Sequence, residues 1–175
     1  AIDFDAVGYA LPSGADIVAR VLYKKTWITE GQAFTDQTRL GLYLREDGVG
    51  TIEHTALRSP DETNGNELVF SQTLDQDVKL LAILPEIEIE STELQIVGVL
   101  PDGARHPLLL IREPDSGWPT RYWFESPQSL PRGSQIEVTA TLRPGAVREP
   151  IPSLFAEDAA IRLLLEFIPG AGASN

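Results

Sequence analysis

The stretch "DVKLLAILPEIEIE", residues 77–90, joins an apolar cluster to a run in which glutamates alternate with isoleucines. Successive side chains of a β-strand point to opposite faces of the sheet, so this alternation predicts a strand. We expect the isoleucines to face a core and the three glutamates to form a solvated row on the other face. The alternating residues are Glu86, Ile87, Glu88, Ile89 and Glu90.

Similar short segments recur along the chain and predict an all-β protein. Each is rich in β-branched, aromatic or leucine residues, and turn signals such as "EDGVG" and "SPQSLPRG" separate them. The Asp-Gly pair in "LPDGARH", residues 100–106, predicts a tight hairpin. Regular short strands with Gly and Pro turns favour an antiparallel β-sandwich. The expected strands are 16–23, 38–46, 51–58, 67–74, 77–90, 93–100, 106–113, 120–126 and 134–142.

The segment "SLFAEDAAIRLLLEFIP", residues 153–169, permits two interpretations. It fits a helix capped by Ser153, in which case one short helix lies near residues 153–160. It equally fits a turn followed by the strand "IRLLLEF", because periodicity does not separate the two over so few residues.

Composition narrows the classes of function. The 175 residues are 42% hydrophobic, which indicates a globular protein, and no apolar run is long enough to span a membrane. The formal net charge of −12 disfavours nucleic acid and anionic membrane surfaces, and it suits either a basic protein partner or simple solubility. The absence of Cys and Met excludes disulfides, thiolate ligands and thioether ligands.

Motifs for catalysis are scarce. The chain contains no G-x-G-x-x-G, Walker or G-x-S-x-G pattern. Its two histidines, His54 and His106, are too few for a copper or zinc site with three imidazoles, so we expect surface or packing roles for both.

The glutamate row and one aromatic cluster remain as candidate sites. Glu86 and Glu88 could hold a hard cation such as Ca²⁺ if another strand supplied more oxygens, act as catalytic carboxylates, or form a partner surface with Glu90. The aromatic residues could bind carbohydrate if their rings were exposed and coplanar, although the alternation of "TRYWFES" favours a packed strand. These residues are Trp118, Tyr122 and Trp123.

Several phrases, in order, resemble a known family. They are "LPSGADIVARVLY" (11–23), "TDQTRLGLYL" (35–44), "VKLLAILPEIEIESTELQIVGVLPDGARHPLLLI" (78–111), "WPTRYWFESPQSLPRGSQIEVTATL" (118–142) and "AEDAAIRLLLEF" (156–167). Together they are similar to bacterial proteins related to the ascorbate-dependent type II copper monooxygenases, the peptidylglycine and dopamine hydroxylase class. The resemblance covers roughly residues 8–168 and implies jelly-roll sandwiches.

The resemblance also implies copper held by histidines and a methionine, but the ligand positions carry other residues. The histidine of the first domain falls on Leu22, the H-x-H pair falls on Glu86 and Glu88, and the methionine falls on Ala160, or on Ile161 if the register slips by one. Carboxylate and aliphatic groups do not suit copper. The resemblance therefore implies the fold of the family without its copper centre or its activity, and predicts no cofactor.

The matched phrases divide the chain into two parts. Residues 1–58 resemble the last strands of the family's first domain, and residues 59–175 resemble its second domain. We expect a non-catalytic binding or structural subunit that associates with other protein subunits. By analogy with the family, it would be periplasmic or otherwise extracytoplasmic, and an accessory component of a bacterial membrane electron-transfer or photosynthetic complex. The alternatives are a metal-dependent enzyme or Ca²⁺-binding module using Glu86 and Glu88, and a soluble carbohydrate-binding sandwich.

Overall fold

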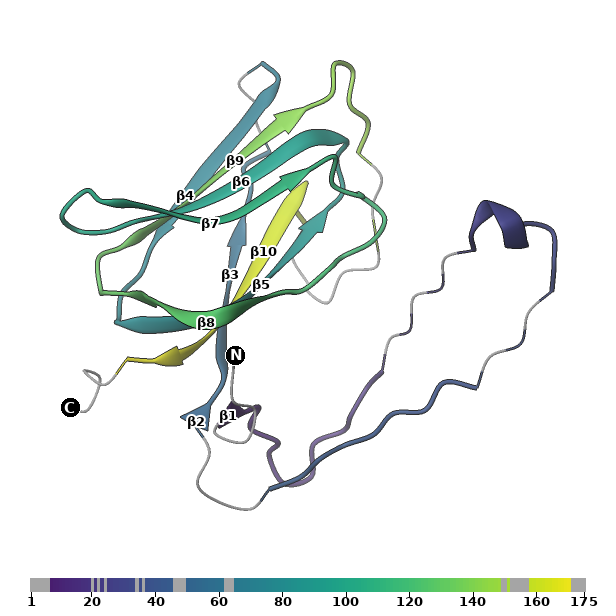
Figure 1. Cartoon of the computed structure of the whole chain (residues 1–175), viewed down its shortest axis with the longest axis horizontal. Coiled ribbons are helices and arrows are strands. Elements are labelled where there is room, and N and C mark those ends of the chain that lie inside the picture. The colour runs from purple at the N-terminus through teal and green to yellow at the C-terminus, as the bar shows by residue number, and fades with distance from the viewer. Residues whose placement is uncertain are drawn as a thin grey trace.

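The protein is a two-layered β-sandwich with one long projection (Figure 1). The computed structural model describes residues 7–19, 21, 23, 25–33, 35, 37–45, 50–61, 65–148, 151 and 158–170. Apart from one short 3-10 helix, every regular element in these residues is a strand, which confirms the predicted all-β class. The elements are β1 Val7–Gly8, η1 Trp27–Thr29, β2 Gly50–Thr51, β3 Glu53–Arg58, β4 Glu67–Thr73, β5 Val78–Ile87, β6 Ser91–Val99, β7 Arg105–Arg112, β8 Tyr122–Leu130, β9 Gln135–Leu142 and β10 Ile161–Pro169.

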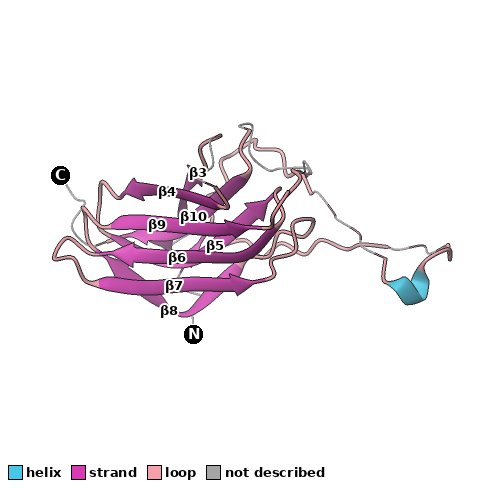
Figure 2. Ribbon diagram, turned by 90° about the horizontal axis from the view of Figure 1, so that it is seen from above, coloured by secondary structure: helices cyan, strands magenta, loops and turns pink. Residues whose placement is uncertain are grey.

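Eight of these strands form the two layers of the sandwich. One sheet has the order β3-β10-β5-β8 and the other β4-β9-β6-β7, with antiparallel neighbours throughout. Figure 2 shows the second sheet lying across the first. From β3 to β9 most connections pass from one sheet to the other, and this wrapped order is that of a jelly roll. The predicted sandwich of jelly-roll type is therefore confirmed.

The hydrophobic core lies between the two sheets. Alternate residues of β9, such as Ile136, Val138 and Ala140, are buried, as the period of two requires for a strand with one face on a core. On the opposite sheet, Ile83 and Leu163 are completely buried. Because apolar area removed from water is the main favourable term in folding, this interior holds the two sheets together.

Strands β5 and β10 differ from the others because they are buried on both faces. Seven consecutive residues of β10, from Ile161 to Phe167, are buried, and all but one of the ten residues of β5 are buried too. They lie next to each other in the middle of their sheet. Their outward faces therefore carry side chains that are hidden from water, and the candidate site lies there.

The hairpin predicted at "LPDGARH" is present between β6 and β7. Gly103 has φ +85°, the left-handed region that suits glycine, and its N–H donates to the carbonyl of Leu100 at 2.8 Å. Asp102 accepts a hydrogen bond from the N–H of Ala104 at 2.9 Å. For "SLFAEDAAIRLLLEFIP", the strand is confirmed over Ile161–Pro169. The alternative helix near residues 153–160 falls largely on residues 152–157, which lie outside the described residues.

We call residues 9–45 the arm, and its described residues leave the sandwich, turn at η1 and return to it (Figures 1 and 2). The short parallel pair of β1 and β2 closes the base of the arm. The prediction of strands at 16–23 and 38–46 is wrong for the described residues of both segments, which belong to no sheet. Neither segment lies beside a strand of the sandwich, so neither gains a hydrogen-bonded neighbour there. Strand β3, by contrast, is one of the two edge strands of the β3-β10-β5-β8 sheet.

Candidate functional site

The antiparallel pairing of β5 with β10 brings three of the carried-over ligand positions together. Glu86 lies opposite Arg162 in the register, and the N–H of Glu88 donates to the carbonyl of Ala160 at 2.8 Å. Glu86 belongs to the end of β5, and Glu88 follows that strand directly. The fourth position, Leu22, lies outside the described residues.

The acidic row is not the solvated face that the alternation predicts. Glu86 and Glu88 are only 2% and 3% exposed, so they offer no surface to a partner, whereas Glu90 is exposed. The prediction for the isoleucines is confirmed, because Ile87 belongs to the core and Ile89 packs against it. The prediction was therefore wrong for the face opposite the core. The alternating sequence does not itself show whether another part of the chain covers that face.

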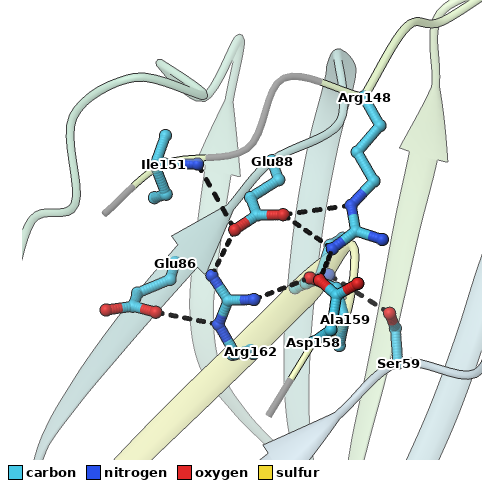
Figure 3. Close-up of polar contacts among 9 residues, drawn as sticks. Ser59, Glu86, Glu88, Arg148, Ile151, Asp158, Ala159 and Arg162 are labelled. Carbon is cyan, nitrogen blue, oxygen red and sulfur yellow. Dashed lines mark hydrogen bonds and ion pairs between the residues drawn. The ribbon is translucent and has the colours of Figure 1, made fainter. Parts of the chain in front are cut away.

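Arg162 of β10 lies between the two glutamates (Figure 3). Its Nε donates to Oε2 of Glu86 at 2.9 Å, and its Nη2 donates to Oε1 of Glu88 at 2.5 Å. Its Nη1 donates to the carbonyl oxygen of Ala159 at 2.9 Å. The guanidinium group is planar and presents donors in a fixed fork, so one arginine serves all three acceptors. Arg162 is itself only 2% exposed.

A second arginine completes the cluster from the connection between β9 and β10. Arg148 donates to Oε2 of Glu88 from Nε at 3.0 Å and from Nη2 at 2.8 Å, and it also pairs with Asp158. The N–H of Ile151 reaches the other oxygen of Glu88 at 3.4 Å. Glu88 therefore joins three parts of the chain that are distant in sequence: the end of β5, the connection around Arg148, and the start of β10 (Figure 3). We call Glu86, Glu88, Arg148, Asp158 and Arg162 the ionic cluster.

The electrostatics of the cluster favour its charged form. Burial acts to raise the pKa of Glu88, but hydrogen bonds from Arg162 and Arg148 outweigh it and hold the pKa of that carboxyl below its usual value. The hydrogen bond to Glu88 likewise raises the pKa of Arg148. The two glutamates and the two arginines balance each other, which is how proteins tolerate buried charges.

Copper, which the family resemblance implies, does not fit these residues. Both oxygens of Glu88 and one oxygen of Glu86 already accept hydrogen bonds from guanidinium or backbone donors. A metal ion would have to displace Arg162 from the buried space between the carboxylates and would meet its positive charge. The same obstacle applies to Ca²⁺, which needs six or more oxygen ligands. Within the described residues, no group of three or more His, Asp or Glu side chains is placed to hold a metal ion.

Sequence reasoning missed both arginines. A signal for Arg162 was present, because "AIRLLLEF" is an otherwise apolar strand that contains one basic and one acidic residue. Charged residues are almost never fully buried unless they are paired, so a partner for Arg162 could have been sought. No such signal marks Arg148, which lies in an irregular connection whose path depends on the fold.

The acidic residue of that strand, Glu166, is the centre of a second polar group on the same face of β10. The hydroxyl of Tyr9 donates to Oε1 of Glu166 at 2.8 Å, and Nε of Arg121 lies 3.0 Å from Oε2 in an ion pair without hydrogen-bond geometry. Burial and the hydrogen bond to Glu166 raise the pKa of Tyr9 to about 12. This contact fixes the beginning of the arm to the sandwich.

The histidines and the aromatic residues lie elsewhere. His54 on β3 and His106 on β7 are both exposed and belong to different sheets. Trp118 and Tyr122 line one cavity of about 250 Å³ at the edge of the sandwich, together with Arg112 and Thr120. Trp123 is not part of that lining, and its ring lies 5.8 Å from Cζ of Arg121. The three rings therefore do not form a single platform.

Neither a scan against models of protein families nor a search of curated proteins finds a match for the chain. The resemblance to copper monooxygenases thus stays a prediction. Among the described residues, no helix has the length and apolar character needed to cross a membrane.

Proposed function

We propose that the chain is a non-catalytic binding or structural subunit of a larger protein assembly, which it joins through the arm. The observation that carries this proposal is the distribution of exposed apolar side chains. Of the seventeen large ones exposed among the described residues, twelve lie between Tyr9 and Leu44. Soluble proteins rarely expose contiguous apolar surface of this kind unless it is an interaction site.

The described part of the sandwich exposes few large apolar side chains. Only Val69, Leu110, Trp118, Trp123 and Val147 are large apolar residues exposed on its described part. Single apolar residues scattered over a surface are normal. The exposed apolar surface that a partner would cover therefore lies mainly on the arm.

The ionic cluster supports the non-catalytic part of the proposal. A general acid or base must exchange a proton with a substrate, yet Glu86 and Glu88 are buried and bonded to arginines. Carboxylates held as ions in this way favour a structural role. Together with the family resemblance, this favours an accessory subunit of an extracytoplasmic assembly, of the kind found in bacterial membrane electron-transfer or photosynthetic complexes.

The test is purification of the tagged full chain from its own cells under mild conditions. We expect a defined set of subunits in fixed stoichiometry, retained through a second column and lost when Leu40 and Leu44 are both changed to serine. The matched control is the Leu110→Ser variant, which removes an exposed apolar side chain from β7 and should retain the partners. Recovery of the wild-type chain alone would overturn the proposal.

Binding of a small ligand at the edge of the sandwich is a second candidate function, favoured by the cavity beside Trp118 and Tyr122. Its aromatic walls and polar rim suit a sugar ring, which stacks on aromatic faces and offers hydroxyls to polar groups. Calorimetric titration with simple monosaccharides and oligosaccharides tests it. A signal that disappears in Trp118→Ala and persists in Trp123→Ala supports this function, and the absence of any heat of binding to the wild-type chain rejects it.

A further inference from the structure

A second cavity lies at the edge of the sandwich where β3 and β4 are the outermost strands of the two sheets (Figure 2). Its volume is about 300 Å³, at the lower end of the range for small-ligand sites. The described residues of its lining come from the start of β3, the end of β4, the turn that leads to β5, and the end of β10. The cavity beside Trp118 is at the opposite edge, among residues of β7 and β8.

Strand β3 contributes polar residues to the inner side of its sheet. Leu57 of this strand belongs to the core. Two residues earlier, Thr55 pairs with Leu165 of β10, and the next alternate residue, Glu53, pairs with Phe167. Directly paired residues share one face of a sheet, and both β10 residues belong to the core. Thr55 and Glu53 therefore point inward, between the two sheets.

Strand β4 supplies another polar residue from the opposite sheet. Leu68 belongs to the core, Phe70 packs against it, and Gln72 follows at the next alternate position. Gln72 pairs with Ile136 of β9, which is completely buried. Three inward positions that line the cavity are thus polar, from both sheets. Polar residues at positions that face a core are unfavourable unless they have a function.

The cavity combines acidic walls with an apolar floor. Asp75, in the turn after β4, adds a second carboxylate to that of Glu53, and the described lining residues include no Lys or Arg. Both acidic residues are exposed, so their carboxylates are accessible to a ligand. Leu74, Val78 and Phe167 are buried core residues that form the apolar part of the lining.

We propose that this cavity binds a small organic cation, with an ammonium group on a short apolar carbon chain. An ammonium group donates three hydrogen bonds, and the carboxylates of Glu53 and Asp75, the amide oxygen of Gln72 and the Thr55 hydroxyl are suitable acceptors. The carbon chain gains free energy by covering the apolar floor. A metal ion would leave that floor unused, and no described group of acidic or histidine side chains is placed to hold one.

The experiment is calorimetric titration of the full chain with cadaverine, an aliphatic diamine, at low ionic strength, where screening of charges is weakest. We expect a Kd below about 1 mM, an affinity within reach of so small a ligand. The neutral diol of the same chain length should bind at least about tenfold more weakly, because it offers no charge to the carboxylates.

Glu53→Gln should weaken binding of the diamine at least about fivefold, since it removes one charge and keeps the shape of the side chain. The matched control is Glu67→Gln, an equally conservative change at the other end of β4, where the side chain is exposed and outside the lining. Gln72→Leu removes the inward amide with little change in size and should also weaken binding. Circular dichroism of each variant verifies that the sandwich is intact.

Three results would overturn the proposal: no heat of binding to the wild-type chain, equal affinity for the diamine and the diol, or equal loss in Glu53→Gln and Glu67→Gln. Displacement of the diamine by an equal concentration of Ca²⁺ would also reject it, because the carboxylates would then attract any cation. Amide shifts in NMR spectra recorded during the titration should centre on Glu53, Gln72 and Asp75. Shifts centred elsewhere would assign the binding to another site.

This inference does not rest on the proposed function, because the cavity belongs to the sandwich and not to the arm. Leu40→Ser with Leu44→Ser tests the assembly and should leave diamine binding unchanged, since neither residue lines the cavity. Loss of diamine binding in that variant would contradict the assigned site. A chain that binds the diamine but purifies alone supports the inference and rejects only the larger assembly.

Discussion

The ionic cluster and the arm reverse the usual placement of residues in opposite ways. In the cluster, Glu86, Glu88 and Arg162 are charged and buried, and the chain supplies their partners itself. In the arm, residues such as Tyr43 and Leu44 are apolar and exposed, and no part of the sandwich covers them. The difference teaches that the buried charges of the cluster find their partners within the chain, whereas the exposed apolar side chains of the arm fit the proposal that another molecule covers them.

The cluster also shows why buried charge is not simply a source of stability. Desolvation of two ions offsets much of their attraction, and an apolar replacement of the whole group is often as stable. The cluster instead fixes the position of the connection around Arg148 and Asp158 against the outer face of β5 and β10. At the base of the arm, Tyr9 makes a comparable contact with the sandwich through its hydrogen bond to Glu166.

The largest effect is expected from breaking the cluster at its centre. Arg162→Ala leaves Glu86 and Glu88 close together in a buried site with one arginine fewer, and should lower the free energy of unfolding by about 3–5 kcal/mol. Urea denaturation at pH 7 measures this change. Arg112→Ala, whose side chain is 80% exposed and 4.0 Å from Glu93, is the matched control and should cost less than about 1 kcal/mol. Equal losses in the two variants would mean that Arg162 does not compensate the glutamates.

Acid should weaken the same cluster through Glu88. Its pKa is lower in the folded protein than the usual value of 4.5, so its stabilising contribution is present above that value and is lost as the pH falls further. We therefore expect the difference in unfolding free energy between the wild type and Glu88→Gln to shrink between pH 5 and pH 3. For Glu90→Gln, in which the side chain is exposed, the difference should stay near zero over that range. A wild-type advantage over Glu88→Gln that grew in acid would contradict the assigned direction.

Predictions from the sequence were correct where the structure depends on contacts between residues that are close in the chain. The alternation in β9 and the Asp-Gly turn before β7 are local features, and both predictions were correct. The burial of Glu86 and Glu88 was not predicted, because it depends on Arg162, which is 76 residues from Glu86 in sequence and reaches it only through the pairing of β5 with β10. The family resemblance placed Glu86, Glu88 and Ala160 in one site, and the structure brings them together, although it could not indicate that arginines fill the space between them.

The arm illustrates the opposite error. Residues 16–23 and 38–46 have the composition of good strands, but propensity in β-structure largely reflects packing against neighbours. The described residues of both segments lie outside any sheet, because no strand of the sandwich lies beside them. The sequence pattern alone therefore did not determine whether these segments pair with strands of the same chain.

A smaller effect is expected where the arm meets the sandwich. Tyr9→Phe removes the hydrogen bond to the buried carboxylate of Glu166 and should cost about 1–2 kcal/mol. The tyrosine that ionises near pH 12 should disappear from a spectrophotometric titration of this variant. Tyr43→Phe is the control, because Tyr43 is 99% exposed, and should leave both the stability and that ionisation unchanged. A full-strength signal near pH 12 in Tyr9→Phe would assign the ionisation to another residue.

The smallest effect on folding is expected in the arm itself. Leu42→Ser should change the free energy of unfolding by less than about 0.5 kcal/mol, since the side chain is already exposed to water. Leu163→Ala, in the core beneath the ionic cluster, should instead cost about 2–5 kcal/mol. If the serine in the arm destabilised the monomer as much as the core substitution does, the arm would belong to the folded unit of the sandwich. The distinction between a sandwich that is stable without the arm contacts and an arm that requires a partner would then be wrong.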